Sequence, residues 1–403
     1  MNLSKRILKI KPSPTLEVTA LANSLRAKGI NVIGFGAGEP DFDTPDFIKK
    51  AAINAINNGK TKYTPVGGIP ELKEAIVEKF RKDNNLEYST NQVTVNCGGK
   101  HSFYNLMQVL LNEGDEVVLI SPYWVSYPSM ILLAGGKPVP IETTEDSGFK
   151  ITPDDIEKAI TKKTKAIVIN SPSNPTGATY TRDELQDLAN IFKKNDILIV
   201  TDDIYEFWIY DNLEFNNIAN LSDEMMKRTI VLNGTSKTYS MTGWRIGYMA
   251  GNEEIIKKVE ILQSQSTSNP ASISQWAAVE AINGDQSFIL KWIREFQNRR
   301  NLIVEKLNQV PGIICKNPDG AFYVFPCIKG VFEMKGWQSI QKKYKSKYNT
   351  TNLSSYLLEE AKVAVVPGIA FGSDNNIRLS FAISDENITE GLERIKKAVD
   401  LLK

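Results

Sequence analysis

The segment SKTYSMTGWRIGY, which begins at Ser236, surrounds one lysine with hydroxyl-bearing and small side chains. Thr235 and Ser236 precede Lys237, and Arg245 follows it by eight positions. A lysine on a protein surface needs no such setting, whereas a lysine that loses its proton and attacks a carbonyl carbon depends on its surroundings. The segment therefore raises the hypothesis of a nucleophilic lysine, which the rest of the chain has to test.

Polar side chains also follow three other short apolar runs of the kind that form strands buried on both faces. Asn174 lies in INSPSNPTG, Asp202 and Tyr205 lie in VTDDIYE, and Trp124 lies in ISPYWVSY. Each has an ordinary alternative on its own, such as a helix cap for Asp202 or a core position for Trp124. Because α/β sheets bind their ligands at the carboxyl ends of the strands, we expect these side chains to meet Lys237 in one site.

A glycine pair, Gly98 and Gly99, stands between a strand-like and a helix-like segment in VTVNCGGKHSF. Free backbone N–H groups at such a helix start suit one phosphate, although an ordinary tight turn explains the pair equally well. GGKH is not the end of a P-loop, because His101 stands where Ser or Thr is required. GFGAG, which begins at Gly34, lacks the spacing of a dinucleotide-binding fingerprint.

The elements around these loops alternate between strand-like and helix-like patterns, which predicts an α/β fold with a mostly parallel sheet. The expected strands are QVTVN, EVVLIS, KAIVIN, ILIVTDD, TIVLNG and WRIGYMAG. Thr181 and Glu184 have the spacing of a capping box at a helix start. From about residue 294 the pattern changes to long amphipathic helices with short strands. We expect an N-terminal segment (1–45) that joins a small C-terminal domain (294–403), and a large domain (46–293) between them.

The composition excludes several classes of protein. The chain has 403 residues, with 48 Lys and Arg against 47 Asp and Glu, which argues against a general nucleic-acid or membrane-surface binder. No apolar run approaches the ~18 residues that span a bilayer. The three cysteines are too few and too far apart for a disulfide framework or a CxxC site, and the N-terminus has no signal-peptide pattern, so we expect a cytoplasmic protein. We assign no metal-binding residues. The lysine-rich stretch 329–352 is interpreted as a solvated insertion.

Taken together, the motifs resemble those of the class I aminotransferases, enzymes of fold type I that depend on pyridoxal 5′-phosphate. The matching segments, in chain order, are AGEPDFDTP, KYTPVGGIPELKEAI, SPYWVSYP, NSPSNPTG, DDIYE, SKTYSMTGWRIGY, GAFYVF, VAVVPG and IRLSFA. The resemblance implies a large domain with a mostly parallel seven-stranded sheet flanked by helices, and a smaller α+β domain. KPSPT, GGK and QSQSTSNPASISQWA are most similar to the aspartate aminotransferases of the bacterial subgroup.

The resemblance also implies how the cofactor is held. Lys237 is the lysine that forms the Schiff base and then moves the Cα proton in the 1,3-proton shift, with Asp202 and Tyr205 as the other catalytic residues. Asp202 holds the pyridine nitrogen protonated, and Tyr205 and Asn174 donate to the ring 3′-oxygen. The remaining residues implied are Trp124 and Ile204 on the two ring faces, Gly98, Gly99, Lys100, Ser236 and Arg245 around the phosphate, and Tyr63 from the neighbouring subunit of a homodimer.

The substrates implied are amino acids and 2-oxo acids. Arg378 clamps the α-carboxylate, with help from Asn174, Trp124 and the backbone of Gly38. Lys100 contacts the distal carboxylate of aspartate or glutamate. Ser13 and Thr15 are expected to close over the site.

Two alternatives to an aspartate:2-oxoglutarate aminotransferase remain open from the sequence. Prephenate has two carboxylates that fit the same cations, so a glutamate/aspartate–prephenate aminotransferase is the first. A pyridoxal-phosphate lyase, of the C–S or aminocyclopropane type, shares the lysine motif and is the second. A transcription regulator with this fold would carry a DNA-binding region ahead of the match, and we find too few residues there for one.

Overall fold

A computed structural model describes residues 2–12 and 14–403 and is built around a seven-stranded sheet. The order of its strands is β2 (Val93–Asn96), β8 (Gly247–Ala250), β7 (Thr229–Gly234), β6 (Leu198–Asp202), β5 (Thr164–Asn170), β3 (Glu116–Ser121) and β4 (Lys137–Glu142). All neighbours pair in parallel except β8, which is antiparallel to both β2 and β7. The predicted α/β fold with a mostly parallel seven-stranded sheet is confirmed.

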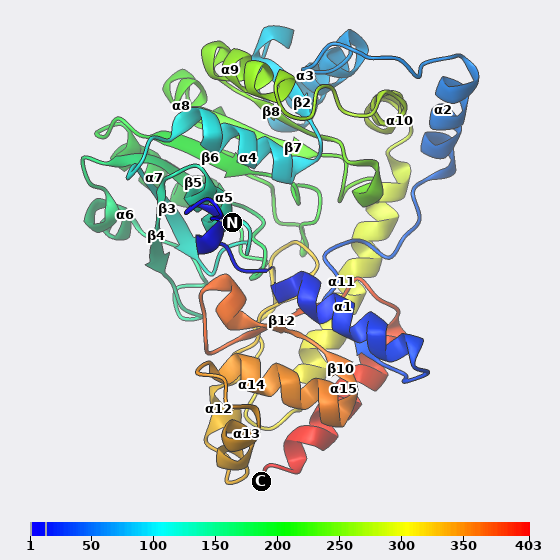
Figure 1. Ribbon diagram of the computed structural model, residues 1–403, viewed down its shortest axis with the longest axis vertical. Helices are drawn as coiled ribbons and strands as arrows, with labels where there is room; N and C mark the ends of the chain where they lie inside the picture. The colour runs from blue at the N-terminus through cyan, green and yellow to red at the C-terminus, as the bar shows by residue number, and fades with distance from the viewer. Residues whose placement is uncertain (1, 13) are drawn as a thin grey trace.

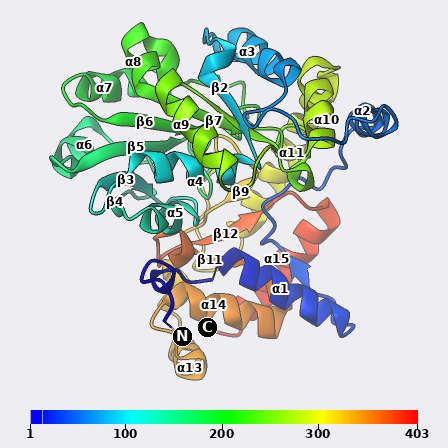
Figure 2. The ribbon, with the colours of Figure 1, turned by 45° about the horizontal axis from the view of Figure 1, so that its top comes forward.

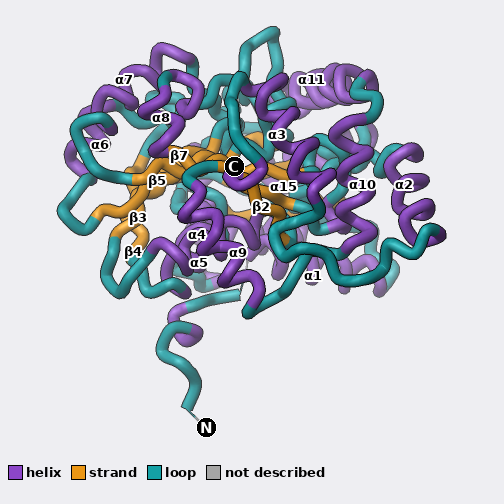
Figure 3. The backbone as a smooth tube through the Cα atoms, turned by 90° about the horizontal axis from the view of Figure 1, so that it is seen from above, coloured by secondary structure: helices purple, strands orange, loops and turns teal. Residues whose placement is uncertain are grey.

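Helices cover both faces of this sheet, as Figure 3 shows. One face packs against α4 (Gly99–Leu110), α5 (Tyr127–Leu133) and α9 (Glu253–Ser264). The other face packs against α3 (Pro70–Asn84), α6 (Pro153–Ala159), α7 (Arg182–Phe192), α8 (Asp223–Arg228) and α10 (Ser272–Asn283), with α2 (Asp46–Asn57) beside α10. The central strands bury side chains of both faces, which explains why their sequences are apolar runs instead of alternating patterns.

A local sequence signal predicts the start of α7 correctly. At the start of α7 the Glu184 amide donates to the Thr181 hydroxyl, and the Thr181 amide donates to the Glu184 carboxylate, which is the predicted capping box. All six predicted strands are present as β2, β3, β5, β6, β7 and β8.

The C-terminal part forms a second layer below the sheet, shown in yellow to red in Figures 1 and 2. It contains a small antiparallel sheet of β11 (Val366–Pro367), β12 (Ile377–Ser380) and β9 (Tyr323–Val324). Its helices are α11 (Ser287–Leu307), α12 (Lys329–Phe332), α13 (Trp337–Tyr344), α14 (Asn349–Tyr356) and α15 (Asp385–Asp400).

The N-terminal segment packs on this C-terminal part, although the two are far apart in the sequence. β1 (Ile33–Gly34) pairs in parallel with β10 (Val363–Ala364), and α1 (Pro14–Ala27) lies beside them, in blue at the lower right of Figure 2. The boundary predicted between residues 293 and 294 falls inside helix α11, which continues through it. The predicted division into three segments stays a prediction.

The lysine-rich stretch 329–352 forms α12, α13 and the start of α14. Trp337 and Ile340 are buried in the core of the C-terminal part, whereas Lys342, Lys343 and Lys345 are exposed. The aromatic side chain therefore serves packing, and the lysines lie in solvent.

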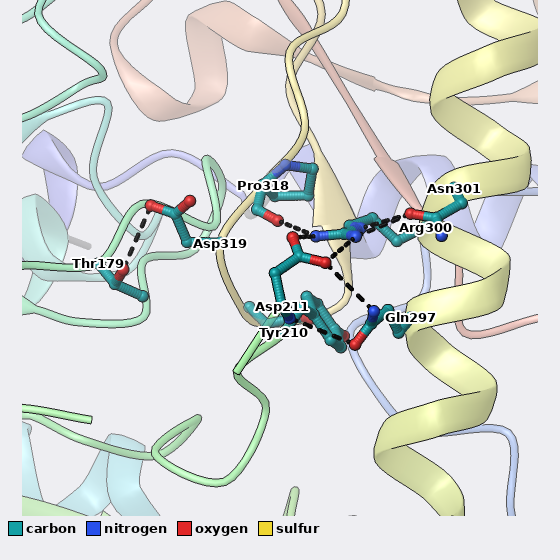
Figure 4. A network of polar contacts seen from close by, with 9 residues as sticks. Thr179, Tyr210, Asp211, Gln297, Arg300, Asn301, Pro318 and Asp319 are labelled. Carbon is teal, nitrogen blue, oxygen red and sulfur yellow. Dashed lines mark hydrogen bonds and ion pairs between the residues drawn. The ribbon is translucent and has the colours of Figure 1, made fainter. Parts of the chain in front are cut away.

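Two neighbouring arginines of α11 join the parts of the chain. Arg300 is 2% exposed and forms two hydrogen bonds to the Asp211 carboxylate, at 2.5 and 2.8 Å, and a third to the Pro318 carbonyl at 3.3 Å. Figure 4 shows this junction between α11 and two loops. Arg299 donates to both oxygens of Asp41, at 2.7 and 2.9 Å, and so holds the N-terminal segment.

We predict that Arg300→Ala destabilises the protein by about 1.5–3 kcal/mol, because the two charge-assisted hydrogen bonds to Asp211 are lost. Thermal unfolding of the purified variant measures the effect. Lys396→Ala is the matched control, since it removes an exposed pair with Asp400 that contributes roughly 0.5 kcal/mol or less. Equal unfolding midpoints for the two variants would contradict the prediction.

Candidate active site

A cavity of about 400 Å³ opens at the carboxyl ends of the sheet strands and contains most of the predicted site residues. Those that line it are Thr15, Gly38, Gly99, Lys100, Trp124, Asn174, Asp202, Ile204, Tyr205, Ser236, Lys237, Arg245 and Arg378. The N-terminal segment, the loops after the strands and the C-terminal part all contribute to its wall. The cavity thus brings together residues that are more than 350 positions apart in the chain.

Three predicted residues need separate mention. Gly98 does not line the cavity, but it is the N-cap of α4 directly beside it. Tyr63 is 91% exposed and does not line the cavity of its own chain. Ser13 lies outside the described residues.

Lys237 follows β7 and reaches into the cavity, where its Nζ donates to the Gly38 carbonyl at 2.5 Å. Burial lowers the pKa of Lys237 to about 8, because the ammonium form loses its hydration. The Glu39 carboxylate opposes this shift, and the Arg378 guanidinium adds to it. The lysine is therefore far closer to its neutral, nucleophilic form than an ordinary lysine near 10.4.

Asp202 stands at the end of β6 and accepts two hydrogen bonds. The buried Tyr127 hydroxyl donates to Oδ2 at 2.5 Å, and the Ile204 amide donates to Oδ1 at 3.4 Å. Burial raises the pKa of Asp202, whereas the Tyr127 hydrogen bond and the Lys237 charge lower it. A cationic or N–H group placed against this carboxyl would favour its ionised form.

Two aromatic rings stand beside Asp202. Trp124 meets Tyr127 edge to face, with ring centroids 5.1 Å apart and an interplanar angle of 83°. The Lys100 ammonium lies 5.2 Å from the centre of the Trp124 ring. The indole is thus fixed at the cavity wall, with a cation beside it.

The start of α4 forms a cradle of backbone and positive charge. Gly98 has a φ of +87°, and a Cβ there would lie 2.2 Å from Arg245 Nη2. A Cβ at Gly247 would lie 2.2 Å from the Gly99 amide nitrogen. Both positions therefore require glycine. The first amides of a helix have no carbonyl ahead of them, so they and Arg245 are available to an anion.

Arg378, on β12, is 2% exposed and lies at the cavity with one unsatisfied donor. Its Nη1 donates to the Asn174 side chain at 3.1 Å and its Nη2 donates to the Gly36 carbonyl at 2.8 Å. Its Nε has no partner among the described residues. A buried guanidinium at the wall of a cavity is suited to a carboxylate ligand.

The cavity residues that sequence reasoning did not single out include Tyr127, Tyr323, Glu39 and Thr242. The Thr242 hydroxyl donates to Glu39 at 2.6 Å, and the Tyr205 and Tyr323 hydroxyls lie 2.9 Å apart. Tyr127 stands three residues after Trp124, and Tyr323 and Glu39 belong to GAFYVF and AGEPDFDTP. The motifs contained the signal, although nothing in the sequence shows which of their residues face the site.

Comparison with known proteins gives the family. Residues 30–395 match the model of the family described as aminotransferase class I and II. The chain belongs to this family. It is therefore an aminotransferase that depends on pyridoxal 5′-phosphate, as the sequence motifs predicted.

The chain is 50% identical to the aspartate aminotransferase of Bacillus subtilis over 400 residues, which cover 99% of both chains. It is also 50% identical to the aspartate/prephenate aminotransferase of Nitrosomonas europaea, over 98% of this chain and 99% of that one. Among solved structures, the aspartate aminotransferase of Rhizobium meliloti matches with a TM-score of 0.94 and 43% identity, over the full length of both chains.

The residues of the cavity fit the cofactor of this family. The start of α4 with Arg245 fits a phosphate, the Asp202 carboxyl fits a pyridine nitrogen, and the Trp124 ring fits an aromatic face. The amine of Lys237 lies in the same cavity and fits an aldehyde. No group of three or more metal-binding side chains occurs among residues 2–12 and 14–403, and no helix there is long and apolar enough to cross a membrane.

We predict that Lys237 of the cofactor-free protein is acylated with a pH midpoint of about 8, because only the neutral amine reacts. Peptide mass spectrometry after brief exposure to an acetylating reagent at a series of pH values gives the midpoint for each lysine. Solvent-exposed lysines serve as internal controls, since such groups titrate near 10.4. A midpoint for Lys237 at that ordinary value would refute the effect of burial.

Proposed function

We propose that this aminotransferase moves the amino group between aspartate or glutamate and 2-oxo acids, in the reaction aspartate + 2-oxoglutarate = oxaloacetate + glutamate. The observation that carries the proposal is one cavity that holds both an amine of lowered pKa, Lys237, and a buried guanidinium, Arg378. The first group suits amine chemistry at a carbonyl carbon, and the second suits the carboxylate that every amino acid and 2-oxo acid carries.

The chemistry divides between the cofactor and the side chains. Pyridoxal 5′-phosphate supplies an aldehyde carbon for the amino group and a ring that takes up the electron pair left at the substrate Cα. Lys237 anchors the cofactor and, once the substrate amine has taken its place, acts as the base that accepts the Cα proton. Its pKa of about 8 leaves roughly a tenth of the amine neutral at pH 7, against about four parts in ten thousand for an ordinary lysine near 10.4, and both roles require the neutral form.

The surrounding residues hold the ring in place. Asp202 receives the pyridine N–H, and the Tyr127 hydroxyl keeps its carboxylate in position. Tyr205 and Asn174 donate to the ring 3′-oxygen, and Trp124 and Ile204 cover the two faces. The amides of Gly99 and Lys100, together with Ser236 and Arg245, bind the phosphate. Gly98 supplies the turn that presents these amides, while its own amide donates to the Asn96 carbonyl at 2.7 Å.

Substrate selection rests on two cations. Arg378 binds the α-carboxylate and is helped by Asn174, which already accepts a hydrogen bond from it, and by the backbone of Gly38. Lys100, exposed at the mouth of the cavity, binds the second carboxylate. Thr15 and Ser13 contribute from the N-terminal side. The aspartate aminotransferase of Thermus thermophilus, 41% identical with a TM-score of 0.90, was solved with the dicarboxylate maleate, which supports this arrangement.

Prephenate is the second candidate for the acceptor. It also has two carboxylates, and the Nitrosomonas europaea relative is named an aspartate/prephenate aminotransferase. A cavity of about 400 Å³ with Lys100 at its mouth is compatible with a ring-sized substrate. Assay of aspartate and glutamate with 2-oxoglutarate, oxaloacetate and prephenate separates the two activities.

We further infer a homodimer that works in the cytoplasm. Tyr63 is almost fully exposed in one chain, as expected of a residue that reaches the phosphate of a neighbouring subunit. Cys97, Cys315 and Cys327 are free thiols, which suits a reducing compartment.

We predict that Lys100→Ala lowers kcat/KM for aspartate and glutamate about ten- to hundredfold, because one charge-assisted hydrogen bond to the second carboxylate is lost. Phenylalanine, which has no second carboxylate, should lose little as a donor. Steady-state kinetics with both donor types give the ratio.

Two variants control this measurement. Arg378→Ala should penalise acidic and neutral donors alike. Lys193→Ala removes an exposed lysine that does not line the cavity and should change nothing. An unchanged ratio of acidic to neutral donors in Lys100→Ala would remove the support for a dicarboxylate substrate.

Mixed subunits test the shared site. Tyr63→Ala and Lys237→Ala subunits are each expected to be strongly impaired, but a hybrid dimer contains one site with both native residues if Tyr63 serves its neighbour. Random mixing should then restore roughly a quarter of the native activity per subunit. No recovery after verified subunit exchange would show that Tyr63 does not complete the other subunit's site.

A further inference from the structure

Tyr323 belongs to the motif GAFYVF, no residue of which has a role in the proposed function. It is the first residue of β9, is fully buried, and lines the cavity. Its hydroxyl lies 2.9 Å from the Tyr205 hydroxyl, and the Arg378 guanidinium carbon lies 4.4 Å from the centre of its ring. Tyr323 thus contacts one residue on each side of the cavity, Tyr205 after β6 and Arg378 on β12.

The backbone around Tyr323 is fixed to both sides. Ser380, two residues after Arg378, pairs with Tyr323 between β12 and β9. On the other side the Ala321 amide donates to the Trp208 carbonyl at 2.8 Å, in the turn that carries Tyr205.

Residues just before Tyr323 belong to the junction in Figure 4, where the Pro318 carbonyl accepts from Arg300 and the Asp319 carboxylate accepts from Thr179. A Cβ at Gly320 would lie 2.5 Å from the Trp208 carbonyl oxygen. The segment therefore sits tightly against the large part of the chain, and the position of the Tyr323 hydroxyl relative to Tyr205 is well defined.

Tyr205 and Tyr323 each carry one hydroxyl hydrogen, and a single hydrogen bond joins the two hydroxyls. One of the two hydrogens is therefore left for another acceptor. Either oxygen can be the donor in the cofactor-free chain. Once Tyr205 uses its hydrogen toward an oxygen of a ligand in the cavity, the bond between the phenols has to come from Tyr323. A chain of hydrogen bonds in one direction strengthens each member, so a donating Tyr323 makes Tyr205 a better donor.

We propose that Tyr323 is a positioning residue whose hydroxyl directs the Tyr205 O–H toward the ring oxygen of the cofactor, while its ring supports Arg378. The inference rests on the proposed function, in which Tyr205 donates to that oxygen. Tyr323 itself transfers no proton and breaks no bond.

Tyr323→Phe tests the hydroxyl and keeps the ring. In the holoenzyme, the Tyr205 hydrogen bond stabilises negative charge on the ring oxygen, so the proton held between this oxygen and the Lys237 nitrogen leaves at a lower pH. The visible absorption of the cofactor reports this midpoint in a spectrophotometric pH titration, without any turnover. We expect Tyr323→Phe to raise the midpoint by about 0.3–1 pH unit, in line with the loss of part of a hydrogen bond.

Three companion measurements make the outcome specific. Tyr205→Phe should raise the midpoint more, and Tyr323→Phe should add nothing in that background. Tyr356→Phe removes another buried hydroxyl of the C-terminal part, one that donates to the Ala398 carbonyl, and should leave the midpoint unchanged. The affinity for maleate should stay within about twofold in Tyr323→Phe, because the ring under Arg378 is retained.

Each result decides a different point. A raised midpoint in Tyr205→Phe with an unchanged one in Tyr323→Phe overturns the role of Tyr323 alone. An unchanged midpoint in both overturns the assignment of Tyr205, which belongs to the proposed function. If the midpoint shifts of Tyr205→Phe and Tyr323→Phe add fully in the double variant, the two hydroxyls are not coupled and the proposal is overturned. If Tyr323→Phe loses as much maleate affinity as Arg378→Ala, the substitution has damaged the whole cavity, and the proposed role of the Tyr323 hydroxyl is overturned.

Discussion

The active site depends on one physical constraint, namely that the amine of Lys237 is buried away from water. Lys237 is useful as a nucleophile and base only because its cavity disfavours the charged amine. That cavity requires walls from three separate parts of the chain, and each wall brings its own charges close to the lysine. Glu39 and Asp202 favour the ammonium form, whereas Arg378 and Arg245 oppose it. The pKa of about 8 is the balance of burial with these four neighbours.

The sheet and the C-terminal part divide the work of recognition. Asp202, at the end of β6, and Trp124, in the loop after β3, line the cavity on the side of the large sheet. Arg378 comes from the small sheet instead, so under the proposed function the carboxylate of a substrate would be bound by a different part of the chain from the one that holds the cofactor. Asn174 connects the two by accepting a hydrogen bond from Arg378. Tyr323, on the strand beside β12, connects them by contacting both Arg378 and Tyr205.

Much of this could be predicted from the sequence, for identifiable physical reasons. Strands buried on both faces leave apolar runs, and a capping box such as Thr181 with Glu184 marks a helix start, so the large sheet and its helices were predictable. Tyr127 was not predicted, because its role depends on the Asp202 carboxylate lying 2.5 Å from its hydroxyl, a contact over 75 positions of chain. The pairing of β1 with β10 had no local signal either, since strands of two residues leave no pattern.

The two adjacent arginines of α11 have a mechanical consequence. Successive residues of an α-helix point about 100° apart around its axis, so Arg299 and Arg300 leave α11 in different directions. One is tied to Asp41 and the other to Asp211, in segments that are separate from the helix and from each other. A roll of α11 about its own axis would therefore pull at least one pair apart, whereas a tilt that pivots near these residues preserves both. The two ion pairs therefore oppose rotation of α11 about its own axis.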